Sequence, residues 1–367
     1  MQARTWVKQA IRIIEADFNR SADTHLIPFH LPAFPDIDFY LKDESSHPTG
    51  SLKHRLARSL FLYALCNGWI QRHSTIVEAS SGSTAVSEAY FARLLNLPFV
   101  SVMPRSTSPE KIALIEFYGG RCHLIDDAAK VTEEAQRLAR ETRGHFMDQF
   151  TYAERATDWR SNNNIAESIF SQMREEPHPV PRWIVCGAGT GGTSATLGRY
   201  VRYLRHDTQI CVADPDYSVF FDHYMNGDPA LTAACGSRIE GIGRPRVEPS
   251  FVRNVIDAMV KVPDAYSLAA LRYLERLLGR KCGGSTGTIF CATLSLAAQM
   301  RADREAGAIV AILCDGGERY LHSYYNDDWL HANGFETAPP LAEIEQFSET
   351  ASAAAWPLPV SRIPVNR

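Results

Sequence analysis

The sequence lacks any long apolar run, which argues against a membrane-spanning helix. Residues 289–300 form one of the longest nearly apolar stretches, and this is well short of the roughly 18 to 20 residues that cross a bilayer. The first residues also lack the features of a secretory signal, because Arg4, Lys8 and Arg12 are scattered among apolar residues and no apolar core or small-residue cleavage site follows. We therefore expect no membrane partner and a cytoplasmic protein.

Metal-binding patterns are also missing. The 8 cysteines include no C-x-x-C pair, and the 12 histidines include no H-E-x-x-H motif, so a metal site has no support from the sequence. Cys186, Cys211 and Cys314 lie in short apolar runs typical of buried strands. We expect mostly structural, reduced thiols, as in a cytoplasm.

The chain carries little excess of either charge. Lys and Arg total 38 and Asp and Glu total 42, which leaves a net charge of −4. So small an imbalance gives no reason to expect nucleic acid or an anionic membrane surface as the main partner. Apolar residues make up 45% and charged residues 22% of the 367 residues, which excludes a disordered chain and favours two domains or one large α/β unit.

Short apolar or β-branched runs alternate with longer stretches of helical period, a pattern typical of a mostly parallel sheet covered by helices. The expected strands cover residues 39–42, 75–78, 99–103, 121–125, 183–186, 209–213 and 309–313. The expected helices cover residues 54–68, 86–95, 109–118, 128–141, 161–175, 194–204, 267–279 and 288–306. The segment from about residue 338 is rich in Ala, Pro and Ser, which indicates a packed-down or partly disordered tail.

A glycine-rich turn, G-A-G-T-G-G-T at residues 187–193, follows one expected strand and precedes a helix. This order places backbone N–H groups and a helix N-terminus where they can hold a phosphate. The string also satisfies G-x-G-x-x-G, and Asp214 lies 22 residues beyond Gly192, as a ribose-binding acid would. The turn by itself therefore leaves an NAD-dependent dehydrogenase open.

Two other turns lead into helices and carry reactive groups. Residues 48–55, P-T-G-S-L-K-H-R, place Lys53 near the first turn of a helix, where the helix dipole disfavours the ammonium form and helps an amine act as nucleophile or base. A solvated surface lysine is the alternative. Residues 78–84, E-A-S-S-G-S-T, put four hydroxyls at a helix start. An N-cap needs one hydroxyl, so the surplus suits a carboxylate-binding loop.

The string G-G-S-T-G at residues 283–287 matches the G-x-S-x-G motif of a hydrolase nucleophile elbow, and Asp315 and two histidines follow in the required order. An elbow needs a buried strand before it, and residues 280–282, R-K-C, are a poor one. We therefore disfavour a serine hydrolase, and a glycine-rich loop is the alternative.

Taken in order, these motifs resemble the second fold type of pyridoxal-phosphate enzymes, the cysteine synthase and cystathionine β-synthase group. The resemblance covers roughly residues 20–330. Its most specific part is K-D-E-S at residues 42–45 followed by residues 48–55, which is similar to the cofactor-lysine signature of the family. Further segments similar to the family are residues 20–26, 103–120, 240–243 and 315–320.

The resemblance implies two α/β domains with mostly parallel central sheets, as in the β-subunit of tryptophan synthase. A smaller domain at residues 41–155 would carry the Schiff-base lysine and the carboxylate loop. A larger domain, formed by residues 1–40 and 156–335, would carry the phosphate loop, and residues 336–367 would form a C-terminal tail. The family also implies a homodimer and a small amino-acid substrate.

The roles of the family residues carry over to matching positions, with pyridoxal 5′-phosphate as the cofactor and no metal. Lys53 would bind the cofactor and move the α-proton of the substrate. The cofactor would contact Gly189, Thr190, Gly191, Gly192, Thr193, Ser83 and Ser285, and the substrate would contact Ser80, Ser81, Gly82, Thr84 and Gln149. A hydroxyl at Ser285 would donate to an unprotonated ring nitrogen, and this weaker electron sink favours loss of a β-substituent over transamination or racemisation.

One departure narrows the expected reaction. Ser83 and Ala85 replace the Asn and the last Gly of the T-S-G-N-T-G loop usual in the family, and such variants resemble a bacterial branch assigned as L-cysteine desulfhydrases. We expect a lyase of cysteine metabolism that performs β-elimination on L-cysteine and releases hydrogen sulfide, pyruvate and ammonia. The alternative is β-replacement of the cysteine synthase or cystathionine β-synthase type. A dehydrogenase is more remote, because hydride transfer has no use for the lysine signature.

Overall fold

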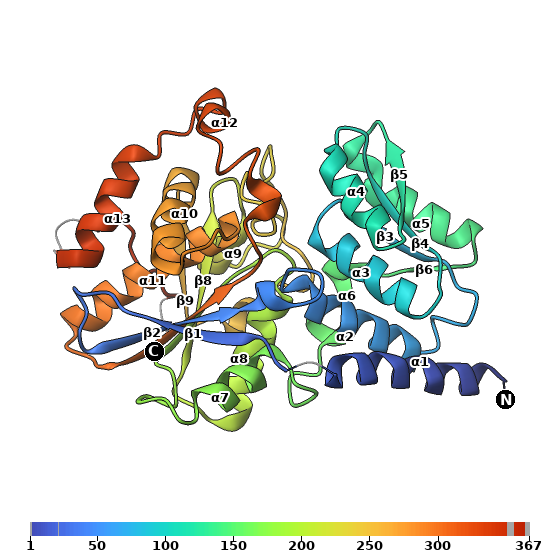
Figure 1. Ribbon diagram of the computed structural model, residues 1–367, viewed down its shortest axis with the longest axis horizontal. Helices are drawn as coiled ribbons and strands as arrows, with labels where there is room; N and C mark the ends of the chain where they lie inside the picture. Colours follow the sequence, from blue (N-terminus) through green and yellow to red (C-terminus); the bar gives the residue numbers. More distant parts are fainter. Residues whose placement is uncertain (1, 21, 351–355, 364–367) are drawn as a thin grey trace. The chain divides into compact units, whose positions relative to one another are not determined.

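The computed structural model describes residues 2–20, 22–350 and 356–363 (Figure 1). The chain divides into two compact units, one made of residues 1–23 and 47–158 and the other of residues 24–46 and 159–367. Both units have an α/β architecture with parallel strands at the centre. The expected α/β fold class with mostly parallel sheets is therefore confirmed.

The smaller unit contains a four-stranded sheet of order β5-β4-β3-β6, in which all neighbours are parallel. Its strands are β3 (Ile76–Ala79), β4 (Phe99–Pro104), β5 (Arg121–Ile125) and β6 (His145–Phe146). Its helices are α1 (Gln2–Asn19), α2 (Lys53–Cys66), α3 (Ser83–Leu94), α4 (Pro109–Phe117), η2 (Ala128–Lys130), α5 (Val131–Glu141) and α6 (Gln149–Ala156).

Alternating side chains of the central strand β3 separate two parts of the core in this unit. Ile76 packs among residues of α2 and α3, whereas Val77 packs against Ala135 and Ala139 of α5. Successive side chains of a strand point to opposite faces of the sheet, so Glu78 lies on the face of Ile76. The hydroxyl-rich segment that follows β3 leads directly into α3 on that face.

The larger unit contains a six-stranded sheet of order β1-β2-β10-β7-β8-β9, parallel except for the edge pair β1 and β2. Its strands are β1 (His25–Phe29), β2 (Ile37–Asp43), β7 (Trp183–Gly187), β8 (Gln209–Pro215), β9 (Ala258–Val262) and β10 (Gly307–Leu313). Its helices are η1 (Glu44–Ser46), α7 (Ile165–Met173), α8 (Gly192–Leu204), α9 (Phe220–Asn226), η3 (Arg253–Val255), α10 (Asp264–Leu278), α11 (Gly284–Ala302), η4 (Glu318–Tyr320), α12 (Asp327–Ala332) and α13 (Ala338–Thr350).

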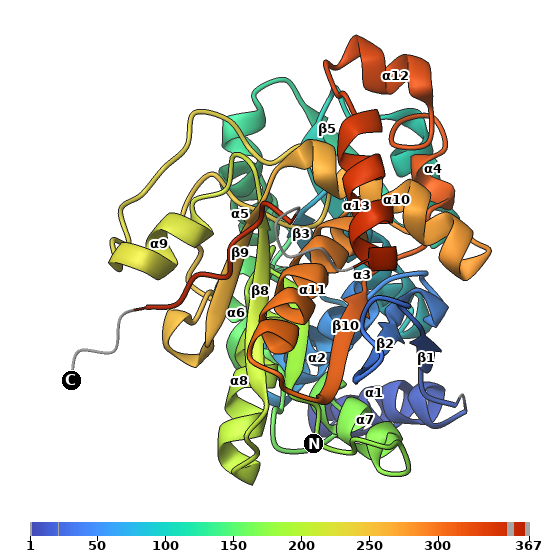
Figure 2. The same ribbon diagram turned by 90° about the vertical axis from the view of Figure 1, so that its left-hand side faces the viewer.

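Helices cover both faces of this sheet. Within the larger unit, α7 and α8 lie on one side of the strands and α10, α11 and α13 on the other (Figure 1). Helix α11 runs along β8 and β10 (Figure 2), and its side chains are buried around most of its circumference. A helix that is apolar all round belongs in a core, and α11 is the central helix of this unit.

All seven expected strands and all eight expected helices are present, and the largest displacements of a boundary, four residues, are in α7 and α11. The sequence predicts a helix from residue 288, but α11 begins at Gly284, so the expected glycine-rich loop at 283–287 is mostly the first turn of a helix. The reason is close packing: a Cβ on Gly287 would lie 2.0 Å from the carbonyl oxygen of Ser267. The glycine therefore allows α11 to pack closely against α10 and does not break the helix.

The units differ from the expected domains at the N-terminus and at residues 41–46, which belong to the larger unit. Helix α1 packs with α2 and α3 of the smaller unit, although residues 1–40 were assigned to the larger domain; the domain boundaries stay a prediction. In the expected tail, residues 338–350 form α13, which packs against α10, while residues 351–355 and 364–367 lie outside the described residues. No helix in the described part of the chain is long and apolar enough to cross a membrane.

Candidate active site

The segment between β3 and α3 holds the hydroxyls expected to bind a carboxylate. Residues 80–83 are half-buried, and a Cβ on Gly82 would meet no other heavy atom within 4 Å. The carbonyl of Ser80 accepts a hydrogen bond from the Ser101 hydroxyl of β4, and the Ser80 hydroxyl accepts one from the N–H of Gly82 at 3.3 Å. No side chain caps the start of α3, so the surplus hydroxyls do not serve as an N-cap.

Thr84 and Gln149 meet within the smaller unit. The Thr84 hydroxyl donates to Oε1 of Gln149 at 2.7 Å, and both residues are buried. Gln149 is the first residue of α6, and its backbone N–H donates to Oε2 of Glu78 at 3.2 Å. The structure therefore joins these two expected site residues and connects them to the end of β3.

Lys53 is the first residue of α2, the position at a helix start that the sequence predicts. Its backbone N–H donates to the Ser51 hydroxyl at 3.2 Å. In the same turn the Thr49 hydroxyl lies 2.9 Å from the Ser87 hydroxyl of α3 and 3.1 Å from Nδ1 of His54. These bonds connect the turn that carries Lys53 to the helix that follows the hydroxyl loop.

The glycine-rich turn of the larger unit runs from β7 into α8. Gly191 has a φ of +88°, and a Cβ there would lie 2.6 Å from both the Ser250 carbonyl oxygen and the Phe251 Cα. The N–H of Gly192, the first residue of α8, donates to the Thr190 hydroxyl at 3.2 Å, and the N-cap residue Gly191 has no side chain that could cap the other N–H groups of the first turn. Only glycine fits at Gly191, and the helix start keeps backbone N–H groups that can bind an anion.

Ser285 lies in the first turn of α11 and is 3% exposed. The adjoining segment is fixed, because the N–H of Gly283 donates to the Asp315 carbonyl at 3.1 Å and a Cβ on Gly283 would lie 1.9 Å from Oδ1 of Asp315. The Tyr320 hydroxyl donates to Oδ2 of Asp315 at 2.6 Å. The Asp315 carboxylate, which a Ser-His-Asp arrangement would need, is therefore already hydrogen-bonded to Tyr320. No strand precedes Ser285 directly, so the hydrolase elbow is excluded.

Asp214 occupies the end of β8, where a dehydrogenase would have its ribose-binding acid. Its side chain is completely buried, and Oδ2 accepts the backbone N–H of Phe221 at 2.8 Å. Burial raises the pKa of Asp214 to about 7. The carboxyl therefore holds the start of α9 inside the unit and does not face a nucleotide.

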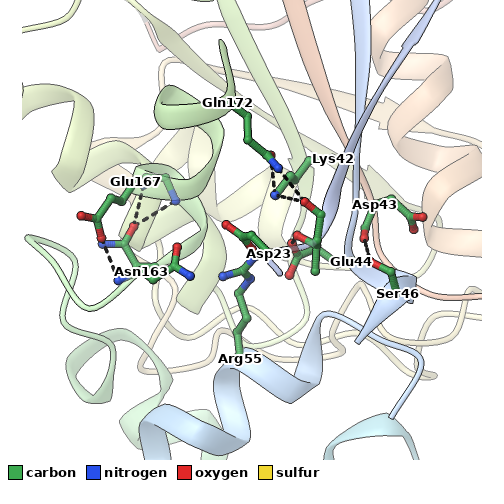
Figure 3. A network of polar contacts seen from close by, with 12 residues as sticks. Asp23, Lys42, Asp43, Glu44, Ser46, Arg55, Asn163, Glu167 and Gln172 are labelled. Carbon is green, nitrogen blue, oxygen red and sulfur yellow. Dashed lines mark hydrogen bonds and ion pairs between the residues drawn. The ribbon is translucent and has the colours of Figure 1, made fainter. Parts of the chain in front are cut away.

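Sequence reasoning missed a buried polar network in the larger unit (Figure 3). Nζ of Lys42 donates to the Thr24 carbonyl at 2.8 Å and to Oε1 of Gln172 at 2.7 Å, and the Thr24 hydroxyl donates to Glu44 at 2.7 Å. Arg280 forms an ion pair with Asp43 at 2.6 Å. The sequence signal that could have revealed this network is the K-D-E run at the end of an apolar strand. Charged residues are rarely buried without partners, so such a run predicts buried polar contacts.

The ion pair between Arg55 and Asp23, both labelled in Figure 3, belongs to the smaller unit. Arg55, two residues after Lys53, contacts Oδ1 of Asp23 at 2.8 Å. The arginine side chain is only 10% exposed, and a buried guanidinium needs such a partner. In this structure the arginine of the lysine signature anchors α2 to the segment after α1.

Comparisons with known proteins agree with these observations. The family model described as "Pyridoxal-phosphate dependent enzyme" matches residues 22–315. The chain is 59% identical over 352 residues to L-cysteine desulfhydrase Cds1 of Mycobacterium tuberculosis, which covers 95% of this chain and 96% of that protein. It is 30% identical over 308 residues to cystathionine β-synthase of Apis mellifera, covering 81% of this chain and 58% of that protein.

Solved structures show the same fold. O-ureido-L-serine synthase matches with a TM-score of 0.73 and 26% identity, over 84% of this chain and 96% of that one. A hydrogen sulfide-producing enzyme from Fusobacterium nucleatum matches with a TM-score of 0.71 and 24% identity, over 85% of this chain and 99% of that one. At this identity the second likeness supports the fold alone.

Proposed function

The chain belongs to the family of pyridoxal-phosphate dependent enzymes, and from this premise we propose that it is a carbon–sulfur lyase that performs β-elimination on L-cysteine. The observation that carries the proposal is the 59% identity to an L-cysteine desulfhydrase over nearly the full length of both chains. The resemblance expected from the motifs, the second fold type and pyridoxal phosphate as cofactor are thereby confirmed. The finer roles of individual residues remain proposals.

The residues at the expected cofactor positions fit this group. At residues 189–193 a helix start follows Gly191, a glycine whose Cβ would clash with backbone atoms, and such a turn suits a phosphate dianion. Ser285 offers a neutral hydroxyl in a buried setting. We propose that the phosphate of the cofactor binds at Gly189, Thr190, Gly191, Gly192 and Thr193. Ser83 and Ser285 would contact the cofactor ring, and Lys53 would form the covalent bond to the cofactor.

When bound, pyridoxal phosphate supplies the electron sink that makes the α-proton of an amino acid acidic. In the proposed reaction the Lys53 amine removes this proton from Cα. The electron pair left on Cα forms the Cα–Cβ double bond as the Cβ–S bond breaks, and sulfur leaves with the pair of that bond. Hydrolysis of the three-carbon product consumes one water and yields pyruvate and ammonia beside hydrogen sulfide.

The substrate carboxylate is proposed to bind at Ser80, Ser81, Gly82 and Thr84, with Gln149 beside them. The open space at Gly82 leaves room for a ligand, and the uncapped start of α3 provides N–H donors for an anion. The bond between Thr84 and Gln149 keeps both side chains oriented. This loop therefore orients the α-carbon toward the base, which is how positioned groups lower a barrier.

β-Elimination and β-replacement differ in the fate of the three-carbon product, and a competing nucleophile separates them. With L-cysteine and excess L-homocysteine, we expect the yield of pyruvate to stay within about twofold of that from L-cysteine alone, because a lyase releases its product before a second substrate reacts. Pyruvate and cystathionine are measured in the same samples. Formation of cystathionine in place of pyruvate would show that replacement is the main reaction.

We also propose that the protein acts as a homodimer in the cytoplasm. The dimer rests on the family resemblance alone. The compartment is supported by the eight cysteines, all of which are free thiols, as a reducing environment maintains them. A molar mass in solution equal to that of one 40.9 kDa chain would contradict the dimer.

A further inference from the structure

Two buried glutamates flank the proposed carboxylate loop. Glu78 lies in β3, just before residues 80–83, and Glu88 lies in α3, just after them. Both residues are 0% exposed. Because Glu78 shares the sheet face of Ile76, which packs toward α3, both carboxyls lie between β3 and α3.

Glu78 connects the loop to α6. Its Oε1 accepts the N–H of Ala79 at 2.7 Å, and its Oε2 accepts the N–H of Gln149 at 3.2 Å. Bonds from N–H groups to an ionised carboxylate are about twice as strong as those between neutral groups. Since the Gln149 side chain in turn accepts from Thr84, the position of Glu78 determines where these two proposed substrate-binding residues lie.

Glu88 has no such donors. Within residues 2–20, 22–350 and 356–363, no N–H or hydroxyl group donates to either of its carboxyl oxygens. The Glu78 carboxyl faces the same buried space between β3 and α3, and its charge acts on Glu88. Two ionised carboxylates would repel strongly in a dry site, whereas one proton converts the contact into a short O–H···O⁻ bond.

The charges around the pair indicate which carboxyl holds this proton. Burial, and then the charge of Glu78, raise the pKa of Glu88 well above its ordinary value. Burial also raises the pKa of Glu78, as does the charge of Asp148, but hydrogen bonds from Ala79, Gln149 and Glu88 act in the opposite direction. Among the residues that the structure describes, two backbone N–H groups donate to Glu78 and none donates to Glu88, so a single proton shared by the pair is better placed on Glu88.

We propose that Glu88 is a positioning residue: its protonated carboxyl donates to Glu78 and thereby holds residues 80–83 and Gln149 in the arrangement that binds the substrate carboxylate. The kinetic part of this inference rests on the proposed function of the loop. The proton on Glu88 is independent of it, because it follows from the burial and contacts of the two side chains.

The proton has a consequence for stability that can be measured without turnover. An unfolded glutamate loses its proton near a pKa of about 4.3, whereas folding retains the proton on Glu88 to a much higher pH. Folding is therefore linked to a bound proton, and the free energy of unfolding falls as the pH rises from the unfolded pKa toward the raised folded one. Glutamine at this position stays neutral at every pH and still offers an N–H donor to Glu78.

The first test compares the melting temperature of the holoenzyme at about pH 5.5 and about pH 8 in wild type, Glu88→Gln and the control Glu133→Leu, an exposed glutamate of α5. We expect wild type and the control to lose stability over this range and Glu88→Gln to lose clearly less. An equal loss in Glu88→Gln would overturn the proposal, because Glu88 would then hold no proton. The melting temperatures test the proton on Glu88 without turnover, so this test remains valid even if L-cysteine is not the substrate.

The second test separates positioning from packing. Glu88→Leu keeps the apolar contacts but removes the donor, so we expect KM for L-cysteine to rise about tenfold while kcat changes less than about threefold. Glu88→Gln should restore KM to within about twofold of wild type. A KM in Glu88→Leu equal to that of wild type would overturn the positioning role. If Glu88→Leu does not fold, the pH dependence of the melting temperature of Glu88→Gln tests the proposal instead.

Discussion

Replacement of Lys53 by alanine is expected to lower kcat for L-cysteine by at least about 10³-fold, because it removes both the proposed base and the covalent attachment of the cofactor. Lys53 begins α2, and the helix dipole there favours a neutral amine. Pyruvate release by purified wild type and variant, at saturating L-cysteine, measures the effect. A matched control is Lys130→Ala, since Lys130 also stands at a helix start but is exposed.

A second readout separates loss of chemistry from loss of folding. Sodium borohydride should fix the cofactor to the wild-type chain and to Lys130→Ala, and it should leave the Lys53→Ala chain unmodified, as mass spectrometry of the intact proteins will show. A Lys53→Ala variant that keeps near-normal turnover would remove this lysine from the mechanism.

Replacement of Gly191 by alanine is expected to weaken cofactor binding by at least about 100-fold. An L-residue at the φ of +88° costs about 1–2 kcal/mol, and the added Cβ would lie 2.6 Å from backbone atoms of Ser250 and Phe251. Backbone cannot move aside as a flexible side chain can, so the turn itself must shift. The start of α8 would then lose its arrangement of N–H donors toward the phosphate.

The control for this variant is Gly279→Ala in the same unit. Gly279 also has a positive φ, +67°, but a Cβ there would meet nothing within 4 Å. It therefore carries the backbone strain without the collision. Titration of both apoproteins with pyridoxal phosphate, followed by absorbance, should show a large loss of affinity in Gly191→Ala only. Equal affinities in the two variants would contradict the assignment of this turn to the phosphate.

The elements that the sequence predicts well are those whose burial is uniform. The central strands of both sheets read as short apolar runs because helices cover both faces. Three strands were missed: β1, β6 and β9. Strand β1 carries Pro28 and lies at a sheet edge, where proline is tolerated, and β9 lies at the opposite edge of the same sheet and contains the half-buried Lys261. Strand β6 has only two residues, too few for any periodicity.

The site was predictable only in part. Lys53, the glycine-rich turn and the hydroxyl loop have signals in residue type and spacing, because a helix start after a strand is a recurrent anion site. The bond between Thr84 and Gln149 joins residues 65 positions apart, and no local pattern reveals such a contact. Glu88 was missed for the same reason, since its meaning depends on Glu78 across the space between strand and helix.

The most direct test of the central claim is the quantification of sulfide and pyruvate released from L-cysteine by the purified holoenzyme. Elimination breaks one Cβ–S bond for each three-carbon product, so the account predicts equal molar amounts of the two products, formed at the same rate. Neither product, or sulfide without matching pyruvate, would contradict β-elimination on L-cysteine as the reaction of this protein.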